Sequence, residues 1–488
     1  PQSLCARRGA ARPRRLSLQP PILWFRRVLR LSDIPALADA LKRSGAVIPV
    51  YVHAPGDEGE WAPGGAQRWW LHESLNRLER SLAEKGSKLI IRQGPAATVI
   101  PALAAETGAT AVLWNRLYEP ALIQRDTELK DALLEDGIEA VSFNAALLAE
   151  PWALRTGAGG PYRVFTPYWR AFGKTIRPAP PLPAPAIMPP PERWPPGLGI
   201  DELGLMPTRD WFESIADCWT PGEAGALERL VTFTDGPVAS YGSDRDVPAQ
   251  AGTSRLSPHL HFGEISPRQA WHATALRQDE PGLRDQVEHF HRELGWREFA
   301  HHVLFHYPDT PTEPMDDRFA RFPWRKDSDE LLGAWRRGRT GFPIVDAGMR
   351  QLWQTGWMHN RVRMIVASLL VKNLRIPWQK GAAWFWDTLV DADLASNTMG
   401  WQWAAGCGAD AAPYFRIFNP LRQAERFDPE GRYVKTWLPE LGGLEGKALH
   451  APWQTGENER CGYPAPVVDL KTSRQEALDA FGAIKSGS

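Results

Sequence analysis

Short apolar runs alternate with amphipathic stretches along residues 21–150. Five runs have the length of buried β-strands: Ile22–Phe25, Val47–His53, Lys88–Arg92, Ala111–Asn115 and Ala140–Phe143. The stretches between them carry apolar residues at helical spacing, as in Arg68–Lys85, Ala96–Thr107 and Ala121–Asp136. This rhythm is typical of βαβ units and predicts a doubly wound, Rossmann-like parallel sheet. The glycine-rich dinucleotide motif is absent after the first run, where Trp24-Phe-Arg-Arg stands instead.

The pattern changes after a proline-rich segment. Residues 174–200 contain ten prolines, which exclude a helix or a central strand and predict a semi-rigid surface linker. From about residue 215 onward helical spacing dominates, as in Leu283–Phe305, Phe342–Leu352, Val362–Leu374 and Ala382–Val390. We therefore expect a disordered extension (1–20), an α/β domain (21–150), a Pro-rich interdomain linker (151–215) and a mostly α-helical domain (216–480).

Composition limits the class of protein. A chain of 488 residues is too long for one core, and 43% hydrophobic and 23% charged residues are ordinary for a soluble protein. The four cysteines form no CxxC pair, which argues against a zinc site or a disulfide framework. Met364–Val371 is too short to cross a bilayer, and the first 20 residues are rich in Arg and Pro without an apolar core. We expect a cytoplasmic monomer that binds no membrane; a transit peptide at the N-terminus is the alternative.

The net charge of zero conceals an uneven distribution. Nine basic residues and a single acid, Asp346, lie between Arg336 and Lys380, interleaved with Trp353, Trp357 and Trp378. Basic residues beside aromatic ones suit the recognition of phosphates and bases, so this run is a candidate DNA-binding face. A solvated helix face is the alternative.

The stretch Asp391–Trp403 combines two carboxylates, two carboxamides and two indoles in 13 residues. It closes a region, Trp353–Trp403, that holds seven of the 23 tryptophans. Indole offers a large flat stacking face and an oxidisable π-system, which aliphatic core residues lack. The pattern predicts a site for a flat aromatic ligand, an electron-transfer path, or both.

Three further motifs are candidates for chemistry. The turn Gly252-Thr-Ser-Arg-Leu-Ser-Pro258 offers amides and hydroxyls that suit phosphate, with an ordinary Ser-Pro helix start as the alternative. Helical spacing places Glu293, Trp296 and Arg297 on one face, as a ligand site or as an ion pair beside a core tryptophan. The polar residues of Asn360–Met364 share about one turn and suggest a lined cavity. His289 and His291 fall on different helix faces, so we expect no metal site.

Together these motifs resemble the photolyase/cryptochrome flavoprotein family, and most of all the microbial photolyases that repair cyclobutane pyrimidine dimers. The resemblance covers nearly all of residues 21–470 and rests on Trp24-Phe-Arg-Arg, Gly252–Pro258, Trp296-Arg-Glu-Phe, Gly341-Phe-Pro-Ile-Val-Asp-Ala-Gly-Met-Arg, Asp391–Trp403 and Asp410–Pro420. It implies an N-terminal α/β domain and a helical domain that binds FAD.

The resemblance also implies roles for individual residues. Those that would hold FAD are Tyr241, Thr253, Ser254, Leu256, Ser257, Arg297, Asn360, Arg363, Asp391, Asp393 and Asn397, the last facing flavin N5. Those that would act on the dimer are Glu293, Trp296, Asn360, Met364 and Trp403, with DNA contacts from Arg245, Trp296, Arg361 and Trp403. The expected electron-transfer chain is Trp401, Trp378 and Trp324, with Trp324 outermost.

The implied activity is light-driven repair of dimers in UV-damaged DNA, single- or double-stranded, by electron transfer from excited reduced FAD to a flipped-out dimer. A cryptochrome-like blue-light receptor is the main alternative, and repair of the (6-4) photoproduct is a third. Plant cryptochromes generally carry an acid in place of Asn397. A second, antenna chromophore is expected, and methenyltetrahydrofolate, deazaflavin and flavin stay open because Pro120-Ala121-Leu122 replaces the polar pair of folate-using relatives. Val28 and Met399 also depart from the family pattern.

Overall fold

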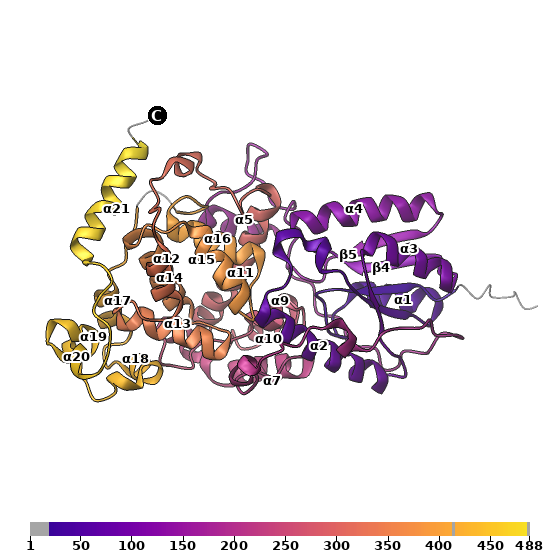
Figure 1. Cartoon of the computed structure of the whole chain (residues 1–488). Coiled ribbons are helices and arrows are strands. Elements are labelled where there is room, and N and C mark those ends of the chain that lie inside the picture. The colour runs from indigo at the N-terminus through magenta and orange to yellow at the C-terminus, as the bar shows by residue number, and fades with distance from the viewer. Residues whose placement is uncertain (1–18, 412–414, 486–488) are drawn as a thin grey trace, which may run out of the picture.

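The computed structural model describes residues 19–411 and 415–485, so the expected extension at residues 1–20 lies almost wholly outside the described part. A five-stranded parallel sheet, in the order β3-β2-β1-β4-β5, forms the N-terminal domain (Figure 1). The strands are β1 (Ile22–Phe25), β2 (Ile48–His53), β3 (Ile90–Gln93), β4 (Ala111–Asn115) and β5 (Glu139–Phe143). The order turns outward in both directions from β1, which confirms the predicted doubly wound sheet.

Helices cover both faces of the sheet. Helices α1 (Pro35–Ser44) and α2 (Gly65–Glu84) pack on the face that carries Leu23 and Phe25 of β1. Helices α3 (Ala96–Thr107) and α4 (Pro120–Glu135) pack on the opposite face, against Ile22 and Trp24. Because alternate side chains enter two different cores, the strands read as unbroken apolar runs.

Residues 151–215 contain more than a linker. Helix α5 (Phe165–Thr175) lies inside this range and packs against the long helix α11 (Arg284–His306). From residue 176 to residue 199 the chain has no helix or strand and follows the α/β domain, where Met188 is buried and its N–H donates to the Lys85 carbonyl (2.8 Å). The first part of the range therefore belongs structurally to the helical domain.

The helical domain begins near residue 213, and short 3₁₀ and π turns connect its helices. The α-helices after α5 are α6 (Glu213–Ala216), α7 (Glu223–Asp235), α8 (Tyr241–Asp244), α9 (Ser257–His261), α10 (Pro267–Ala275), α11, α12 (Asp329–Arg336), α13 (Pro343–Thr355), α14 (Asn360–Ser368), α15 (Trp378–Thr388), α16 (Leu394–Ala405), α17 (Pro420–Phe427), α18 (Arg432–Trp437), α19 (Gly446–His450), α20 (Glu457–Arg460) and α21 (Leu470–Lys485). Three 3₁₀ turns precede this domain: η1 (Pro55–Trp61), η2 (Ile200–Leu203) and η3 (Asp210–Phe212). Within it are η4 (Pro237–Ser240), η5 (Asp317–Arg321), the π turn η6 (Leu369–Asn373), η7 (Pro439–Leu441) and η8 (Pro452–Gln454).

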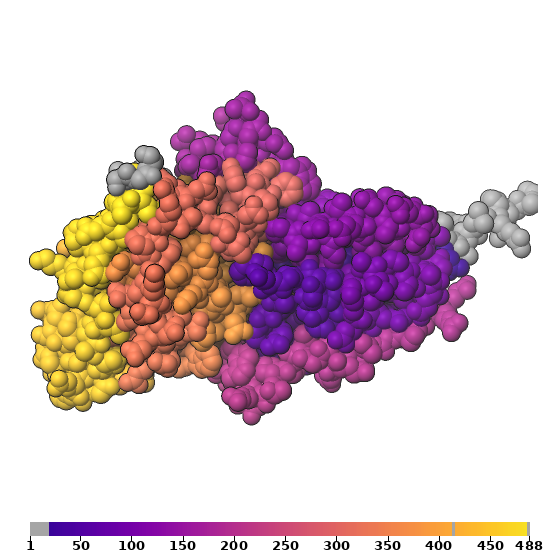
Figure 2. All heavy atoms as spheres, turned by 45° about the horizontal axis from the view of Figure 1, so that its top comes forward, coloured from indigo at the N-terminus to yellow at the C-terminus, as the bar shows by residue number. Residues whose placement is uncertain are grey.

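The two domains form one elongated body, with the α/β domain at one end and α17–α21 at the other (Figures 1 and 2). Their interface contains Glu264, a fully buried carboxylate between α9 and α10. It accepts hydrogen bonds from Trp70 Nε1 (3.0 Å) and Ser74 on α2 and from the Gly222 N–H (2.7 Å), and it pairs with His259. Glu264 thus connects α2 of the first domain to two segments of the second.

Backbone contact also joins the domains. Gly263 has φ +61°, and a Cβ atom there would lie 2.1 Å from the Arg27 carbonyl oxygen, so only glycine permits this approach. Val28, which departs from the family pattern, is buried beside Gly263. An apolar side chain therefore fits this position. In the described part of the chain, no helix is long and apolar enough to cross a membrane.

Candidate active site

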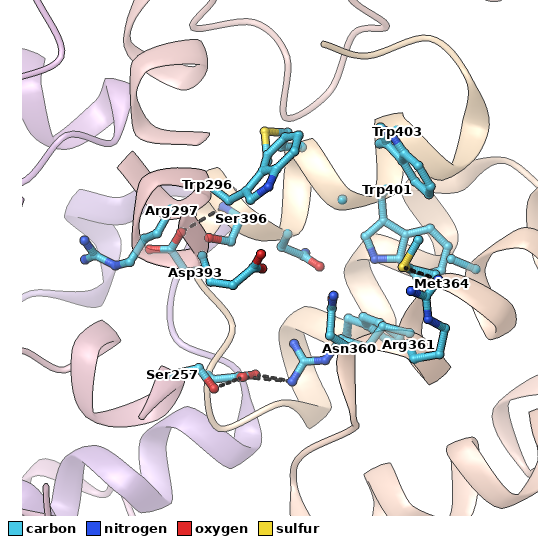
Figure 3. A pocket seen from close by; sticks show the side chains of 18 of the residues that line it. Ser257, Trp296, Arg297, Asn360, Arg361, Met364, Asp393, Ser396, Trp401 and Trp403 are labelled. Carbon is cyan, nitrogen blue, oxygen red and sulfur yellow. Dashed lines mark hydrogen bonds and ion pairs between the residues drawn. The ribbon is translucent and has the colours of Figure 1, made fainter. Parts of the chain in front are cut away.

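A cavity of about 630 Å³ opens between α11, α14 and α16, with α8 and α9 at its edge (Figure 3). The structure brings most of the predicted site residues to its wall, although they come from segments more than 150 positions apart in the sequence. They are Arg245, Ser257, Glu293, Trp296, Arg297, Asn360, Arg361, Arg363, Met364, Asp391, Asp393, Asn397, Trp401 and Trp403. The volume lies in the range of small-molecule and cofactor sites.

Asp391 is the centre of a buried polar group on this wall. It accepts two hydrogen bonds from the Arg363 guanidinium (2.8 and 3.0 Å) and one from Ser257 Oγ (2.6 Å). Arg363 is fixed further by its Nε, which donates to the Met358 carbonyl (2.7 Å). The charged pair and its hydrogen bonds hold α9, α14 and the loop before α16 in register.

Asp393 lies two residues later and begins α16 as its N-cap, accepting the Ser396 N–H (2.8 Å). Burial alone would raise the pKa of Asp393, but His301, His261 and Arg297 hold that pKa well below its ordinary value. Both imidazoles approach the carboxylate, at 3.6 and 3.7 Å. The cavity therefore contains an ionised carboxylate that can accept hydrogen bonds from a ligand.

The opposite part of the cavity carries the side chains expected to act on substrate. Glu293 forms an ion pair with Arg245, and Arg361 bonds Asp246 (2.9 Å). Trp296 and Trp403 lie on either side of the cavity in Figure 3. Two aromatic faces and a carboxylate thus converge on one space, as binding of a flat polar ring requires.

Four predicted FAD contacts are not on the cavity wall: Tyr241, Thr253, Ser254 and Leu256. Tyr241 is buried beneath the Arg245 guanidinium, 5.4 Å from the ring centroid. Leu256 precedes α9, and its side chain packs in the core, so it can offer only backbone groups to a ligand. The roles of these four residues stay predictions.

Comparisons with known proteins agree with this geometry. A family model described as DNA photolyase matches residues 21–186, and one described as the FAD binding domain of DNA photolyase matches residues 290–483. A deoxyribodipyrimidine photo-lyase of Agrobacterium fabrum is 48% identical over 479 residues, which cover 96% of this chain and 99% of the relative. The chain belongs to the photolyase/cryptochrome family.

Both branches of the photolyase/cryptochrome family are represented among the relatives. Cryptochrome-1 of Arabidopsis thaliana is 38% identical, covering 96% of this chain and 71% of the relative. The crystal structure of a bacterial class III photolyase from Agrobacterium tumefaciens superimposes with a TM-score of 0.93 at 47% identity, covering 97% of this chain and 99% of that one. The shared fold therefore extends over both domains.

The family's cofactor, FAD, fits the residues present. Asp391 and Asp393 supply carboxylate acceptors for N–H groups, while Arg297 and Arg363 supply cationic donors. Asn397 is fixed in the wall because its Nδ2 donates to the Ala382 carbonyl (3.1 Å). A cavity of about 630 Å³ with both donors and acceptors suits a large polar ligand with a flat ring.

Of the three tryptophans in the expected electron-transfer chain, Trp324 is partly exposed, whereas Trp401 and Trp378 are both buried. Trp401 also lines the cavity, and Trp378 lies in the same hydrophobic core. Helices α15 and α16 approach closely here, since a Cβ at Gly381 would lie 2.2 Å from the Trp401 ring. The partial exposure of Trp324 is compatible with its place as the outermost member, which stays a prediction.

The basic run between Arg336 and Lys380 does not form one face. Only Arg361 and Arg363 reach the cavity, and Lys372 is buried with its Nζ donating to the Ala405 carbonyl (2.6 Å). Arg350 pairs with Glu440 and Arg375 with Glu476. Buried Lys372 interrupts the run, so its members do not form one continuous surface at the cavity, and DNA binding by the others stays a prediction.

The wall also contains residues for which the sequence suggested no role, among them Asp246, Ser396, Asp410 and Arg416. The Arg416 guanidinium lies 5.4 Å from the centroid of the Trp403 ring. Arg416 belongs to the motif Asp410–Pro420, so a basic residue within a recognised motif was the available signal. Met399 also lines the wall, which places this departure from the family pattern at the site itself.

Two smaller cavities lie near the C-terminal edge of the sheet. One has a volume of about 50 Å³ and is lined by Arg26 and Arg125. The Cζ atoms of these two guanidinium groups lie 4.8 and 4.9 Å from the centroid of the Trp24 ring. The other, of about 180 Å³, lies between the domains and is lined by Arg27, Glu58, Trp61, Glu119, Trp386 and Leu394, among others. The second is the roomier place for another aromatic ligand.

Proposed function

We propose that this protein is a deoxyribodipyrimidine photolyase, which uses light and FAD to split cyclobutane pyrimidine dimers in DNA. The observation that carries the proposal is the single cavity shared by Glu293, Trp296 and Trp403 with Asp391 and Asp393. FAD, when bound, supplies the photoexcited electron. The names of the relatives at 48% and 37% identity, both deoxyribodipyrimidine photo-lyases, support the same activity.

The residues of the chain position the substrate. A dimer must leave the base stack to enter the cavity, which costs a few kcal/mol, as is general for enzymes of this class. Trp296 and Trp403 offer aromatic faces that offset this cost by stacking. The Glu293 carboxylate accepts a hydrogen bond from an N–H group of the pyrimidine edge, and Arg245 keeps that carboxylate oriented. Exclusion of water by these walls strengthens each polar contact.

The decisive experiment illuminates the purified protein with an oligonucleotide that contains one thymine dimer. Restored thymines, detected by chromatography, would establish repair. Flavin absorption bands without repair would favour the cryptochrome-like receptor, for which the 38% identity with Cryptochrome-1 is the supporting observation. A protein that binds no flavin would reject both functions.

We also propose that a second chromophore binds the interdomain cavity of about 180 Å³. Trp61 and Trp386 supply aromatic contacts there, and Arg27, paired with Glu58 and Glu119, supplies a polar part of the wall. Leu394 lines this cavity and directly follows Asp393 of the main cavity, so energy would be transferred over a short distance. An absorption band in addition to those of FAD would identify the chromophore.

Glu293→Ala is expected to lower the repair yield about tenfold while FAD stays bound, since one hydrogen bond to a charged group contributes about 1.5–3 kcal/mol. Repair is measured per absorbed photon, and FAD content by absorbance. Glu288→Ala is the matched control, because Glu288 is exposed on the same helix. An unchanged yield in Glu293→Ala would reject the assigned role.

Trp324→Phe is expected to slow light-driven reduction of oxidised FAD and to leave repair by chemically reduced protein unchanged. A phenyl ring is much harder to oxidise than an indole, so the path to the surface is broken. Absorbance during illumination measures the reduction rate. Trp453→Phe serves as control, because Trp453 is also partly buried but packs on Phe342 instead. Equal rates in the two variants would contradict the proposed path.

Binding to damaged DNA is expected to weaken as salt rises. If three phosphates are contacted, the general slope of about −0.9 per phosphate implies about a 40-fold loss between about 50 and 200 mM salt. Arg416→Ala should reduce the magnitude of that slope by about one, because Arg416 lies at the cavity. Arg375→Ala, at a site paired with Glu476, should not change it. A salt-independent affinity would contradict phosphate contact at this face.

A further inference from the structure

One face of Trp296 is covered by another ring. Phe165, the first residue of α5, stacks on Trp296 with ring centroids 3.7 Å apart and planes inclined by 11°. Phe165 is 1% exposed, so this contact is part of the packed interior. Only the other face of the indole is available to a ligand in the cavity.

Helix α5 is held against α11 by a second stacked ring. Trp169 lies one turn after Phe165, with centroids 6.1 Å apart and planes inclined by 14°. It fills a notch at Gly295, where a Cβ atom would lie 2.4 Å from the indole. Three nearly parallel rings, Trp169, Phe165 and Trp296, therefore run from α5 to the cavity wall. Phe165 cannot shift along α11 without breaking this stack.

The beginning of α5 is fixed by Asp410, a residue of the cavity wall. Asp410 Oδ1 accepts the Phe165 N–H (3.2 Å), and the Asp410 N–H donates to the Arg163 carbonyl (3.1 Å). Val164, at the N-cap position, has no side-chain oxygen to offer, so the carboxylate comes from a distant part of the chain. The negative charge also suits the positive end of the helix.

We infer that Phe165, held by Trp169 and Asp410, is a positioning residue that sets the plane of Trp296 and thereby determines selectivity for the lesion. The inference rests on the proposed function, because it assigns Trp296 to stacking on a flipped-out dimer. A platform fixed before binding loses little conformational freedom when the lesion arrives. A tilted indole would stack less well on the lesion and would leave nonspecific phosphate contacts unchanged.

The first test measures the indole itself. In protein labelled with 5-fluorotryptophan, the ¹⁹F signal of Trp296 is assigned with Trp296→Phe. Phe165→Leu is expected to shift that signal, because it removes the stacked ring. Phe342→Leu is the matched control: Phe342 is equally buried in the same domain and packs on Trp453, with ring centroids 5.6 Å apart, so its removal leaves the Trp169–Phe165–Trp296 stack intact. An unmoved Trp296 signal in Phe165→Leu would overturn the inference.

The second test measures selectivity, as the ratio of affinities for the same oligonucleotide with and without one thymine dimer. Phe165→Leu is expected to reduce the ratio about tenfold, with Phe342→Leu within twofold of the unsubstituted protein, since stacking on one aromatic ring contributes about 1–3 kcal/mol per base. Equal FAD absorbance and melting temperature in the two variants control for folding. A preserved ratio despite a shifted ¹⁹F signal would overturn the selectivity role.

Substitutions of Asp410 test the inference without removing the Phe165 ring. Asp410→Asn keeps an acceptor oxygen and tolerates the positive φ of 57°, so selectivity should be retained. Asp410→Ala removes the acceptor and should shift the Trp296 signal and reduce selectivity. If Asp410→Ala reduces selectivity without moving that signal, the route through Phe165 is wrong. If the unsubstituted protein does not prefer the lesion, the proposed function fails, while a Trp296 signal that moves in Asp410→Ala, where the Phe165 ring is retained, still shows that the start of α5 orients Trp296.

Discussion

Glu264→Ala is expected to lower the free energy of unfolding by about 3–5 kcal/mol, the general cost of removing one partner from a buried charged group. Glu264 is fully buried and accepts from Trp70, Ser74 and Gly222 while pairing with His259. Alanine would leave all of these polar groups without an acceptor in a space that water cannot fill freely. Because the partners belong to both domains, the loss should also loosen the domain interface.

Urea denaturation followed by tryptophan fluorescence measures this effect, since Trp70 is itself a partner of Glu264. Glu264→Gln retains one acceptor oxygen and should cost much less. Glu440→Ala is the surface control: it removes the partly exposed pair with Arg350, which should contribute less than about 1 kcal/mol. A Glu264→Ala protein as stable as Glu440→Ala would show that the interface does not depend on this carboxylate.

Asp391→Ala is expected to weaken FAD retention about 100-fold or more. The substitution leaves the Arg363 guanidinium without its carboxylate partner at the cavity wall. A loss of about 3 kcal/mol corresponds to a factor of about 100 in affinity. The two hydrogen bonds from Arg363 and the one from Ser257 also disappear, so the wall itself loses its alignment.

FAD retention is measured from flavin absorbance after dialysis against buffer without FAD. Asp391→Asn helps to separate the loss of the charge from the loss of the acceptors, because it removes the charge but keeps one acceptor oxygen. Asp387→Ala is a control in the same region; Asp387 accepts the Gly65 N–H (2.9 Å) and does not line the cavity. Full flavin content in Asp391→Ala would contradict the proposal that Asp391 is needed for FAD retention.

Helix α5 shows where sequence reasoning failed for a physical reason. The ten prolines after residue 174 predict a linker, and the expected linker begins at residue 151. Phe165, Tyr168 and Phe172 carry helical spacing and are buried, so a local signal for α5 was present. The helix ends before the prolines begin to dominate, at Thr175. The proline-rich composition of residues 151–215 as a whole obscures this shorter helical signal.

One helical prediction is confirmed although burial is one-sided only in the first half of the helix, since all residues from Glu298 to Leu304 are buried. Residues Leu283–Phe305 were expected as a helix and form α11 (Arg284–His306) almost unchanged. The stretch Val362–Leu374 was expected as one helix and is instead α14 followed by the π turn η6. Hydrophobic spacing does not distinguish these two, because a single π turn shifts the register by only one residue.

The sequence by itself determined the sheet, most of the helices and the kind of chemistry. Strand and helix periods are local properties, and neighbours such as Glu293 and Trp296 share a face within one turn, so both can be inferred from spacing. The tertiary structure alone decided which distant residues meet. In the folded chain Asp410 accepts the N–H of Phe165 at the start of α5, and Glu264 accepts the indole N–H of Trp70 on α2. Most of the basic run does not line the cavity. Those contacts join residues far apart in the chain. Their distances depend on how whole helices pack, and a local sequence pattern does not contain that information.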